Sequence, residues 1–199
     1  MASYRAVNGV LLALESFFKA RLPADLSAAP VNARIELLGS SDITDLLNGN
    51  VLGIYMHRMT VDAHGRSRFF AATGTERDAA PAPELPVNLH LLLIASATSA
   101  SIEASLMAWA MFALANESQL DISHLAENDS QWTEREVLTV TPEEMPTEDL
   151  MRIWDAFQTP YTSSVPYIVR TIRLRLDAQQ TEGPAVLSRI FPTGIAESS

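Results

Sequence analysis

The segment VNLHLLLIASATSA, which begins at Val87, is the most apolar strand candidate in the chain. A strand that is apolar on both faces has to be covered on both faces, so we expect it in the middle of a sheet. His90 interrupts the run, and a histidine in such a place is more often a hydrogen-bonded core or edge residue than a catalytic base. The segment therefore predicts a sheet with strands on either side of it and helices packed against it.

Apolar residues at three- and four-residue spacing predict three main helices. The first extends from about Ser3 to Arg21 and is stopped by Pro23. The second has Ser101 as its N-cap and ends near Asn116, and the third has Thr147 as its N-cap with acidic residues in its first turn. The expected buried faces are Val7, Val10, Leu11, Leu14, Phe17 and Phe18 in the first helix, Ile102, Leu106, Trp109 and Ala113 in the second, and Leu150, Ile153, Trp154 and Phe157 in the third.

Strand patterns flank these helices. β-Branched and aromatic residues, with turn residues between them, favour strands at Val31–Leu38, Val51–Val61 with a hairpin return from Arg68 to Ala72, Val137–Val140, Val165–Leu176 and Ala185–Phe191. The stretch TERDAAPAPELP, residues 75–86, is expected to be an exposed, mobile loop. We predict an α/β (α+β) fold with a mixed, mostly antiparallel sheet flanked by about three helices. Residues 1–192 would form a single domain, and 193–199 a flexible C-terminal tail.

Composition excludes several kinds of protein. The 199 residues contain no cysteine, which excludes a disulfide framework, a thiolate zinc site and a cysteine nucleophile. A formal net charge of −10 makes nucleic acid an improbable partner, because phosphate contacts need clustered Lys and Arg. No window reaches 18 uninterrupted apolar residues, and polar residues interrupt the apolar stretch near the N-terminus, so we expect neither a membrane span nor a signal peptide.

The motifs of common active sites are also missing. The chain has no Gly-x-Gly-x-x-Gly, no Gly-x-Ser-x-Gly and no His-Glu-x-x-His. His57 and His64 have no third ligand at a defined spacing, so we read them as a strand residue and a turn residue rather than a metal site. Glu143 and Glu144 lie in polar sequence without an apolar pocket to raise a pKa. We therefore expect no catalytic, cofactor-binding or metal-binding residue.

The strand Val165–Leu176 carries Arg170, Arg173 and Arg175 in an otherwise acidic chain. Alternation assigns Ile168, Ile172 and Leu174 to one face, and Arg170 breaks that face, so we expect Arg170 to have a carboxylate partner. Arg173 and Arg175 lie on the other face, where the strand would leave the core. Such charges are most often a solvated face, but they could also contact an acidic face of another copy.

Three blocks of sequence together resemble a known family. They are VLGIYMHRM, then LPVNLHLLLIASATS leading through AMFALANESQL, and MRIWDAFQTPYTSSVPYIVRTIRL. Their order and spacing are similar to the tail terminator, or cap, proteins of phage-tail-like contractile injection systems, in the domain that forms their N-terminal part. The most specific block contains Trp154, the Thr159-Pro160-Tyr161 turn and the strand that begins at Ser164. The segment IASATSAS lacks the aromatic residue and longer polar loop common in the family, and Pro166 lies at the start of its strand.

The resemblance implies a structural subunit without enzymatic activity. Such subunits form a ring, expected to be hexameric, on the distal end of the inner tube and sheath, where they end polymerisation and anchor the sheath. The implied partners are copies of the chain and the tube and sheath proteins. The implied location is the bacterial cytoplasm during assembly and then the particle. We expect Arg170, Arg173, Arg175, Tyr161, Glu143 and Glu144 at the subunit or tube and sheath interface. The alternatives are another adaptor or baseplate component and, in a different class, a small α/β enzyme that uses His57 or His90 in a pocket.

Overall fold

The computed structural model describes residues 4–41, 43, 48–62, 84–120 and 137–175. Several predictions from the sequence lie outside these residues. They are the hairpin return at 68–72, the strand at 185–191, the tail at 193–199 and His64.

The described residues form a six-stranded sheet in the order β1-β2-β3-β6-β5-β4. Only β1 and β2 run parallel, and the other neighbours are antiparallel. The apolar segment forms β3, which lies in the interior of the sheet between β2 and β6, as predicted. The mixed, mostly antiparallel sheet with three main helices confirms the predicted fold class. The strands are β1 Arg34–Leu38, β2 Val51–Val61, β3 Glu84–Ser96, β4 Gln119–Leu120, β5 Leu138–Pro142 and β6 Ser164–Arg175.

Most element boundaries agree with the sequence patterns to within a few residues. Strand β1 starts three residues later than predicted, and β3 starts at Glu84, so the last three residues of the expected loop at 75–86 are strand. A short helix between α1 and β1 was not predicted. The helices are α1 Ala6–Arg21, α2 Ala24–Ser27, α5 Ala100–Asn116 and α7 Thr147–Phe157.

Two predicted helix caps are wrong. Helix α5 is capped by Ser99, whose Oγ accepts a hydrogen bond from the backbone N–H of Ile102 at 3.3 Å, and not by Ser101. In α7, Thr147 is the first helical residue rather than the N-cap. Pro146 precedes it, and the Pro146 carbonyl accepts the first backbone hydrogen bonds of the helix. Proline suits this position because it needs no N–H there and its φ is already restricted.

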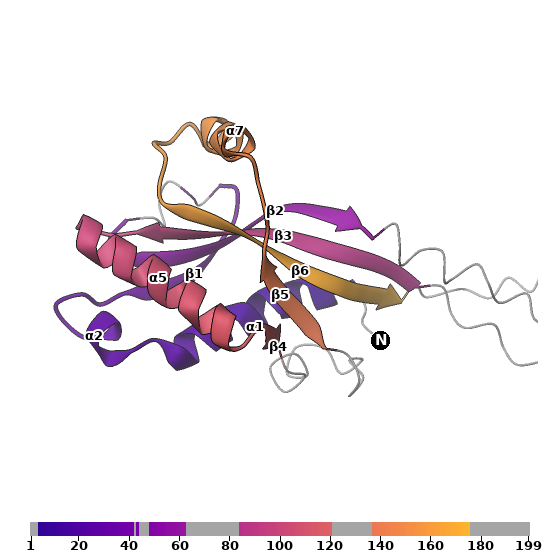
Figure 1. Cartoon of the computed structure of the whole chain (residues 1–199), viewed down its shortest axis with the longest axis horizontal. Coiled ribbons are helices and arrows are strands. Elements are labelled where there is room, and N and C mark those ends of the chain that lie inside the picture. Colours follow the sequence, from indigo (N-terminus) through magenta and orange to yellow (C-terminus); the bar gives the residue numbers. More distant parts are fainter. Residues whose placement is uncertain (1–3, 42, 44–47, 63–83, 121–136, 176–199) are drawn as a thin grey trace, which may run out of the picture.

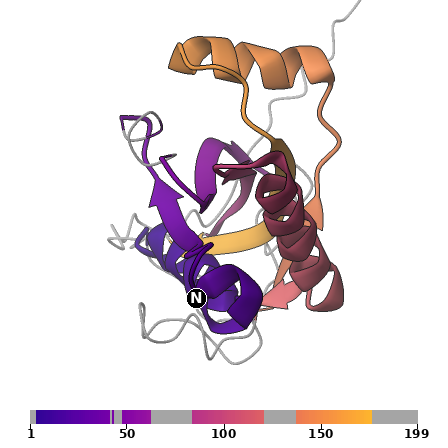
Figure 2. The ribbon, with the colours of Figure 1, turned by 90° about the vertical axis from the view of Figure 1, so that its left-hand side faces the viewer.

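The two faces of the sheet are covered differently (Figures 1 and 2). Helices α1 and α5 pack on one face, here called the inner face, and enclose the main core around residues such as Phe17, Leu91 and Leu106. Helix α7 lies on the opposite, outer face and covers only one end of it, through a smaller cluster around Leu92, Ile94 and Trp154. Of the described helices, only α7 lies on this face.

Trp154 anchors α7 to the sheet. Its side chain is 2 % exposed, and its Nε1–H donates a hydrogen bond to Ser164 Oγ at the start of β6 over 3.0 Å. The rings of Phe157 and Tyr161 contact the Trp154 ring edge to face, with ring centroids 5.7 and 5.9 Å from that of Trp154. The buried N–H therefore has a partner, and the aromatic cluster fixes where α7 lies on the outer face.

A β-bulge in β6 overturns the predicted alternation of that strand. Arg170 and Thr171 together lie opposite a single residue of β3, so the pleat shifts by one residue between Val169 and Ile172. Val169 and Ile172 consequently both face the inner core, although one is odd-numbered and the other even-numbered. An extra residue in one strand has this effect because side chains alternate with a period of two.

The interpretation of Arg170 changes accordingly. Ile168 and Ile172 lie on opposite faces, so Arg170 does not interrupt a continuous apolar face. It is exposed on the outer face, and no ion pair joins it to a carboxylate within the described part of the chain. Arg173 lies on the same face and is also exposed. The expected carboxylate partner of Arg170 is therefore not found there.

Within the described residues, none of the helices has the length and apolar composition that crossing a membrane requires.

Candidate functional site: the outer face of the sheet

Polar and charged side chains occupy the part of the outer face that α7 leaves uncovered. They come from strands β2, β3 and β6 and from the connection between β5 and α7. This region is called the outer-face patch and consists of His57, Arg58, Thr60, Asn88, His90, Glu143, Arg170 and Arg173.

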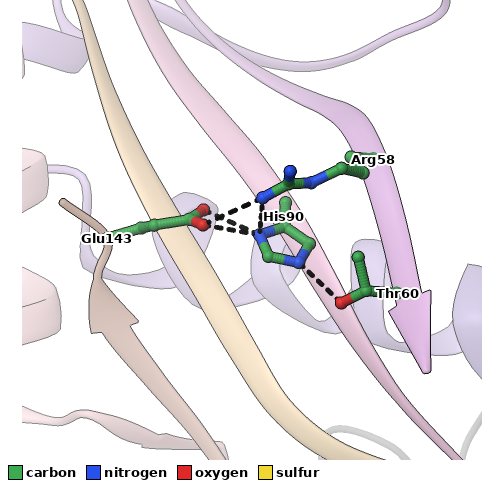
Figure 3. Close-up of polar contacts among 4 residues, drawn as sticks. All are labelled: Arg58, Thr60, His90 and Glu143. Atoms are coloured by element: carbon green, nitrogen blue, oxygen red, sulfur yellow. Dashed lines mark hydrogen bonds and ion pairs between the residues drawn. The ribbon is translucent and has the colours of Figure 1, made fainter. Parts of the chain in front are cut away.

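His90 is the most deeply buried member of the patch, with 5 % of its surface exposed (Figure 3). Its Nδ1 lies 2.7 and 2.8 Å from the two carboxylate oxygens of Glu143, and its Nε2 lies 2.8 Å from Thr60 Oγ1. A carboxylate only accepts hydrogen bonds, so His90 Nδ1 carries the proton and donates the hydrogen bond to Glu143. In the neutral ring, Nε2 then accepts from the hydroxyl of Thr60.

Arg58 completes this network from the neighbouring strand. One of its terminal nitrogens lies 3.3 Å from Glu143 Oε1 and 3.2 Å from His90 Nδ1 (Figure 3). The Arg58 nitrogen and His90 Nδ1 are both donors, so of these two contacts only the one with Glu143 is a hydrogen bond. The guanidinium is 55 % exposed, so this ion pair contributes little by itself. Glu143 thus ties the segment before α7 to β2 and β3.

His57 lies in the bulge of β2, where the pairing with β3 shifts between Met56 and Arg58. Its ring contacts that of His90 edge to face, with centroids 6.0 Å apart. Burial lowers the pKa of His57 below 6.5, and the charge of Arg58 and the neighbouring His90 act in the same direction, while Glu143 opposes them. His57 is therefore neutral at pH 7.

Two buried polar atoms of the patch, His57 Nε2 and Asn88 Oδ1, have no hydrogen-bond partner in the described part of the chain. Burying a polar atom without a partner costs free energy, and such atoms are few in folded proteins. Both atoms are enclosed, so the exposed arginines are the groups of the patch that another molecule can reach.

The structure brings some of the predicted interface residues together. Arg170 and Arg173 share the patch with Glu143, whose side chain is only 16 % exposed and is engaged within the chain. Glu144 is exposed immediately beside it. Arg175 ends β6.

Tyr161 does not belong to the patch. It is 51 % exposed and lies against Trp154, next to α7.

Sequence reasoning did not assign Arg58, Thr60 and Asn88 to this surface. Alternation along β3 could have placed Asn88 on the face of His90, but the bulge in β2 moves Arg58 and Thr60 off the face that alternation gives them. The pairing register that brings them next to His90, and the return of the chain at Glu143, had no signal in the sequence.

An open groove lies beside the patch, between the β5–α7 connection and the start of β6. Its volume is about 570 Å³, and it is lined by Glu143, Glu144, Met145, Pro146 and Pro166. Its walls are mainly apolar, with the two glutamates at its border. Within the described residues, no group of three or more His, Asp or Glu side chains is placed to hold a metal ion.

Comparison with known proteins identifies the fold. The family model of the Pvc16 N-terminal domain matches residues 9–188. No protein with a curated description matches the sequence.

Two solved structures share the fold at low sequence identity. The sheath/tube terminator of the extracellular contractile injection system PVC, in its extended state, has a TM-score of 0.59 and 16 % identity over 96 % of this chain and 65 % of its own. The tube-terminating cap of the anti-feeding prophage has a TM-score of 0.55 and 14 % identity over 92 % of this chain and 59 % of its own. The chain thus spans about 65 % and 59 % of the length of these two proteins.

The family match covers far more than half of the sequence, and the resemblance indicated by its three sequence blocks is confirmed. The chain belongs to the Pvc16 N-terminal domain family.

Proposed function

We propose that this chain is a structural subunit of the cap that ends the inner tube and sheath of a contractile injection system. The observation that carries the proposal is the family match over residues 9–188, together with a fold shared with two caps over 96 % and 92 % of the chain. In this role the chain stops tube polymerisation and holds the last layer of sheath. It would be made in the bacterial cytoplasm and leave it as part of the particle.

The subunits would form a ring, expected to contain six copies. A cyclic ring joins two different patches of each subunit, because every copy contacts the next in the same way. In a chain with a net charge of −10, two copies can make contact only where opposite charges meet or where both surfaces are uncharged. The outer-face patch supplies exposed cationic groups, Arg170 and Arg173, without carboxylate partners in the described residues.

The outer-face patch would contact an acidic surface of a neighbouring copy or of a tube or sheath protein. Arg170, Arg173 and Arg175 are the residues proposed to make this contact, with Glu144 and Tyr161 near its border. Glu143 would contribute indirectly, by holding the β5–α7 connection against His90.

The role is structural rather than catalytic. His90 has only 5 % of its surface exposed and links Glu143 to Thr60 within the chain, so its ring is not presented to a substrate. The patch is therefore better suited to binding a surface than to general acid–base chemistry.

Tube assembly in the presence and absence of the chain tests the proposal. The chain would be mixed with the tube protein of the same particle, and the products examined by electron microscopy. A cap predicts tubes that stop growing, with added density on one end only, and a broad length distribution when the chain is omitted. Unchanged tube lengths, or density at the baseplate end, would contradict the assignment and favour an adaptor or baseplate role.

A further inference from the structure

Helix α5 has an exposed face without a single charged residue. Five positions with 3-4-3-4 spacing are exposed along it, and Phe112 lies beside them. The only charged residue of the 17-residue helix, Glu103, is partly exposed in the first turn. The five positions are Ser101, Ala104, Ala108, Met111 and Ala115.

The large apolar side chains of this face are concentrated near the C-terminal end of the helix. Phe112 is 66 % exposed and Met111 is 39 % exposed, whereas the turns before them carry only Ala and Ser on the same side. A helix with apolar residues on all sides is normally buried on all sides. The inner face of the sheet covers one side of α5, and the other side has no partner among the described residues.

The groove beside the outer-face patch has complementary properties. Its walls of Met145, Pro146 and Pro166 are apolar, and its volume of about 570 Å³ exceeds that of a single aromatic side chain. Pro166 pairs with Leu92 of β3, whose side chain belongs to the outer cluster, so the groove lies on the outer face. Helix α5 packs on the inner face (Figures 1 and 2). The projecting side chains and the groove therefore lie on opposite faces of the same sheet.

We propose that Phe112 of one copy, flanked by Met111, inserts into the groove formed by Met145, Pro146 and Pro166 of the next copy. This contact rests on the proposed cap function and names the part of each subunit that joins the ring. A projection on one face and a groove on the other make a head-to-tail contact, which is the type that generates rings.

Charge favours a second copy as the occupant of the groove. Glu143 and Glu144 border it, so an approaching surface with free carboxylates would be repelled. The exposed face of α5 adds no charge there. Glu117, just beyond the end of the helix, forms an ion pair with Arg21 of its own chain. The exposed face of α7, by contrast, carries Glu148, Asp149 and Asp155 and would be repelled from the groove.

The absence of native cysteine allows a direct test by disulfide cross-linking. Cysteines at Ala108 or Ala115, on either side of Phe112, would each be combined with Glu144→Cys, which leaves Phe112 and the groove walls intact. The variants would be oxidised during assembly on tube ends and analysed on non-reducing gels. We expect at least one double variant to give a ladder of cross-linked species, whereas each single variant stays monomeric.

The matched control moves the second cysteine to Arg152, which is exposed on α7 and does not line the groove. It should give no ladder. A strong dimer band from A108C or A115C alone would show that two α5 faces meet each other and would overturn the proposal.

Side-chain substitution separates this contact from the cap function itself. Phe112→Ser should lower the yield of rings at least tenfold, while Val137→Ser, a change at a 53 % exposed apolar residue just before β5, should leave it unchanged. Rings that form normally with Phe112→Ser, or that cap tubes without any cross-link in the double variants, would overturn the contact but not the cap. Failure of the unmodified chain to bind tube ends would overturn both.

Discussion

Glu143 contacts two strands at once, although it lies in the connection between β5 and α7. Its carboxylate accepts from His90 Nδ1 at 2.7 Å and from Arg58 at 3.3 Å. A buried donor that loses its acceptor costs more free energy than the hydrogen bond itself contributes, because the N–H stays dehydrated. The stability of the outer face therefore depends on this carboxylate more than on the exposed arginine.

Removal of the Glu143 carboxylate should consequently destabilise the chain. We expect Glu143→Ala to lower the free energy of unfolding by about 1–3 kcal/mol, because it leaves His90 Nδ1 without an acceptor. Glu144→Ala, at the exposed neighbouring residue, should change it by less than about 0.5 kcal/mol. Urea unfolding followed by circular dichroism measures both values. Equal effects of the two substitutions would mean that the His90 contact contributes little.

His57 predicts a pH dependence of stability. Its pKa is lowered in the folded chain, chiefly by burial, whereas in the unfolded chain it titrates near 6.5. Below pH 6.5 the unfolded chain therefore binds more protons than the folded chain. The contribution of His57 to folding stability is fully present above pH 6.5 and is lost as the pH falls from 6.5 to the lowered pKa of the folded chain.

A comparison of variants isolates this contribution from the carboxylates. Unfolding free energies of the original chain and of His57→Gln would be measured between pH 7.5 and 5. The difference between them should change as the pH falls, with the original chain losing more stability. A constant difference across the range would contradict a lowered pKa for His57.

The β-bulges determine which side chains share a face. In β6 the extra residue moves Arg173 to the outer face, beside Arg170, and keeps Ile172 on the inner core. In β2 the bulge places Arg58 opposite His90. Without these two irregularities, simple alternation would send some of these side chains to the opposite face.

The start of α5 gives a prediction that distinguishes two neighbouring serines. Ser99→Ala should lower the free energy of unfolding by about 1 kcal/mol, since Ser99 Oγ accepts from the backbone N–H of Ile102. Ser101→Ala should be close to neutral, because Ser101 is an exposed residue inside the helix. Thermal unfolding of both variants measures the difference. A larger loss for Ser101→Ala would place the cap where the sequence pattern had suggested it.

The whole molecule presents different chemistry on opposite sides. The outer face has exposed arginines, a polar network and a groove, and the side of α5 that faces away from the sheet has uncharged small and apolar residues. A subunit with two unlike sides suits head-to-tail association.

Charge reversal on the outer face should prevent assembly without unfolding the chain. We expect the double variant Arg170→Glu, Arg173→Glu to abolish binding to tube ends or neighbouring copies, because both residues are exposed and their charges would change from complementary to repulsive. Its circular dichroism spectrum and melting temperature should match those of the original chain.

The matched control for this variant is Arg34→Glu, Arg152→Glu, on the edge strand β1 and on α7. It should assemble normally. Normal assembly of the Arg170/Arg173 variant would show that those arginines are ordinary surface residues.

The sequence by itself determined the three main helices, the longer strands and the packing of helices on a sheet. The apolar side chains of β3 can be buried on both faces only in the interior of a sheet. The apolar stripe from Val10 to Phe18 can be buried only when that helix packs against a sheet. These signals are local, because burial on one or both faces leaves a period of 3.6 or 2 in the chain. The three sequence blocks also indicated the family.

Only the tertiary structure decided which residues meet on the outer face. The contact of His90 with Glu143 joins positions 53 residues apart, and it depends on the strand order and on bulges that leave no periodic signal. The same is true of Arg173, whose face was predicted wrongly because alternation assumes an unbroken pleat. Local patterns specify what a residue must be buried against, but pairing register decides which residues become neighbours.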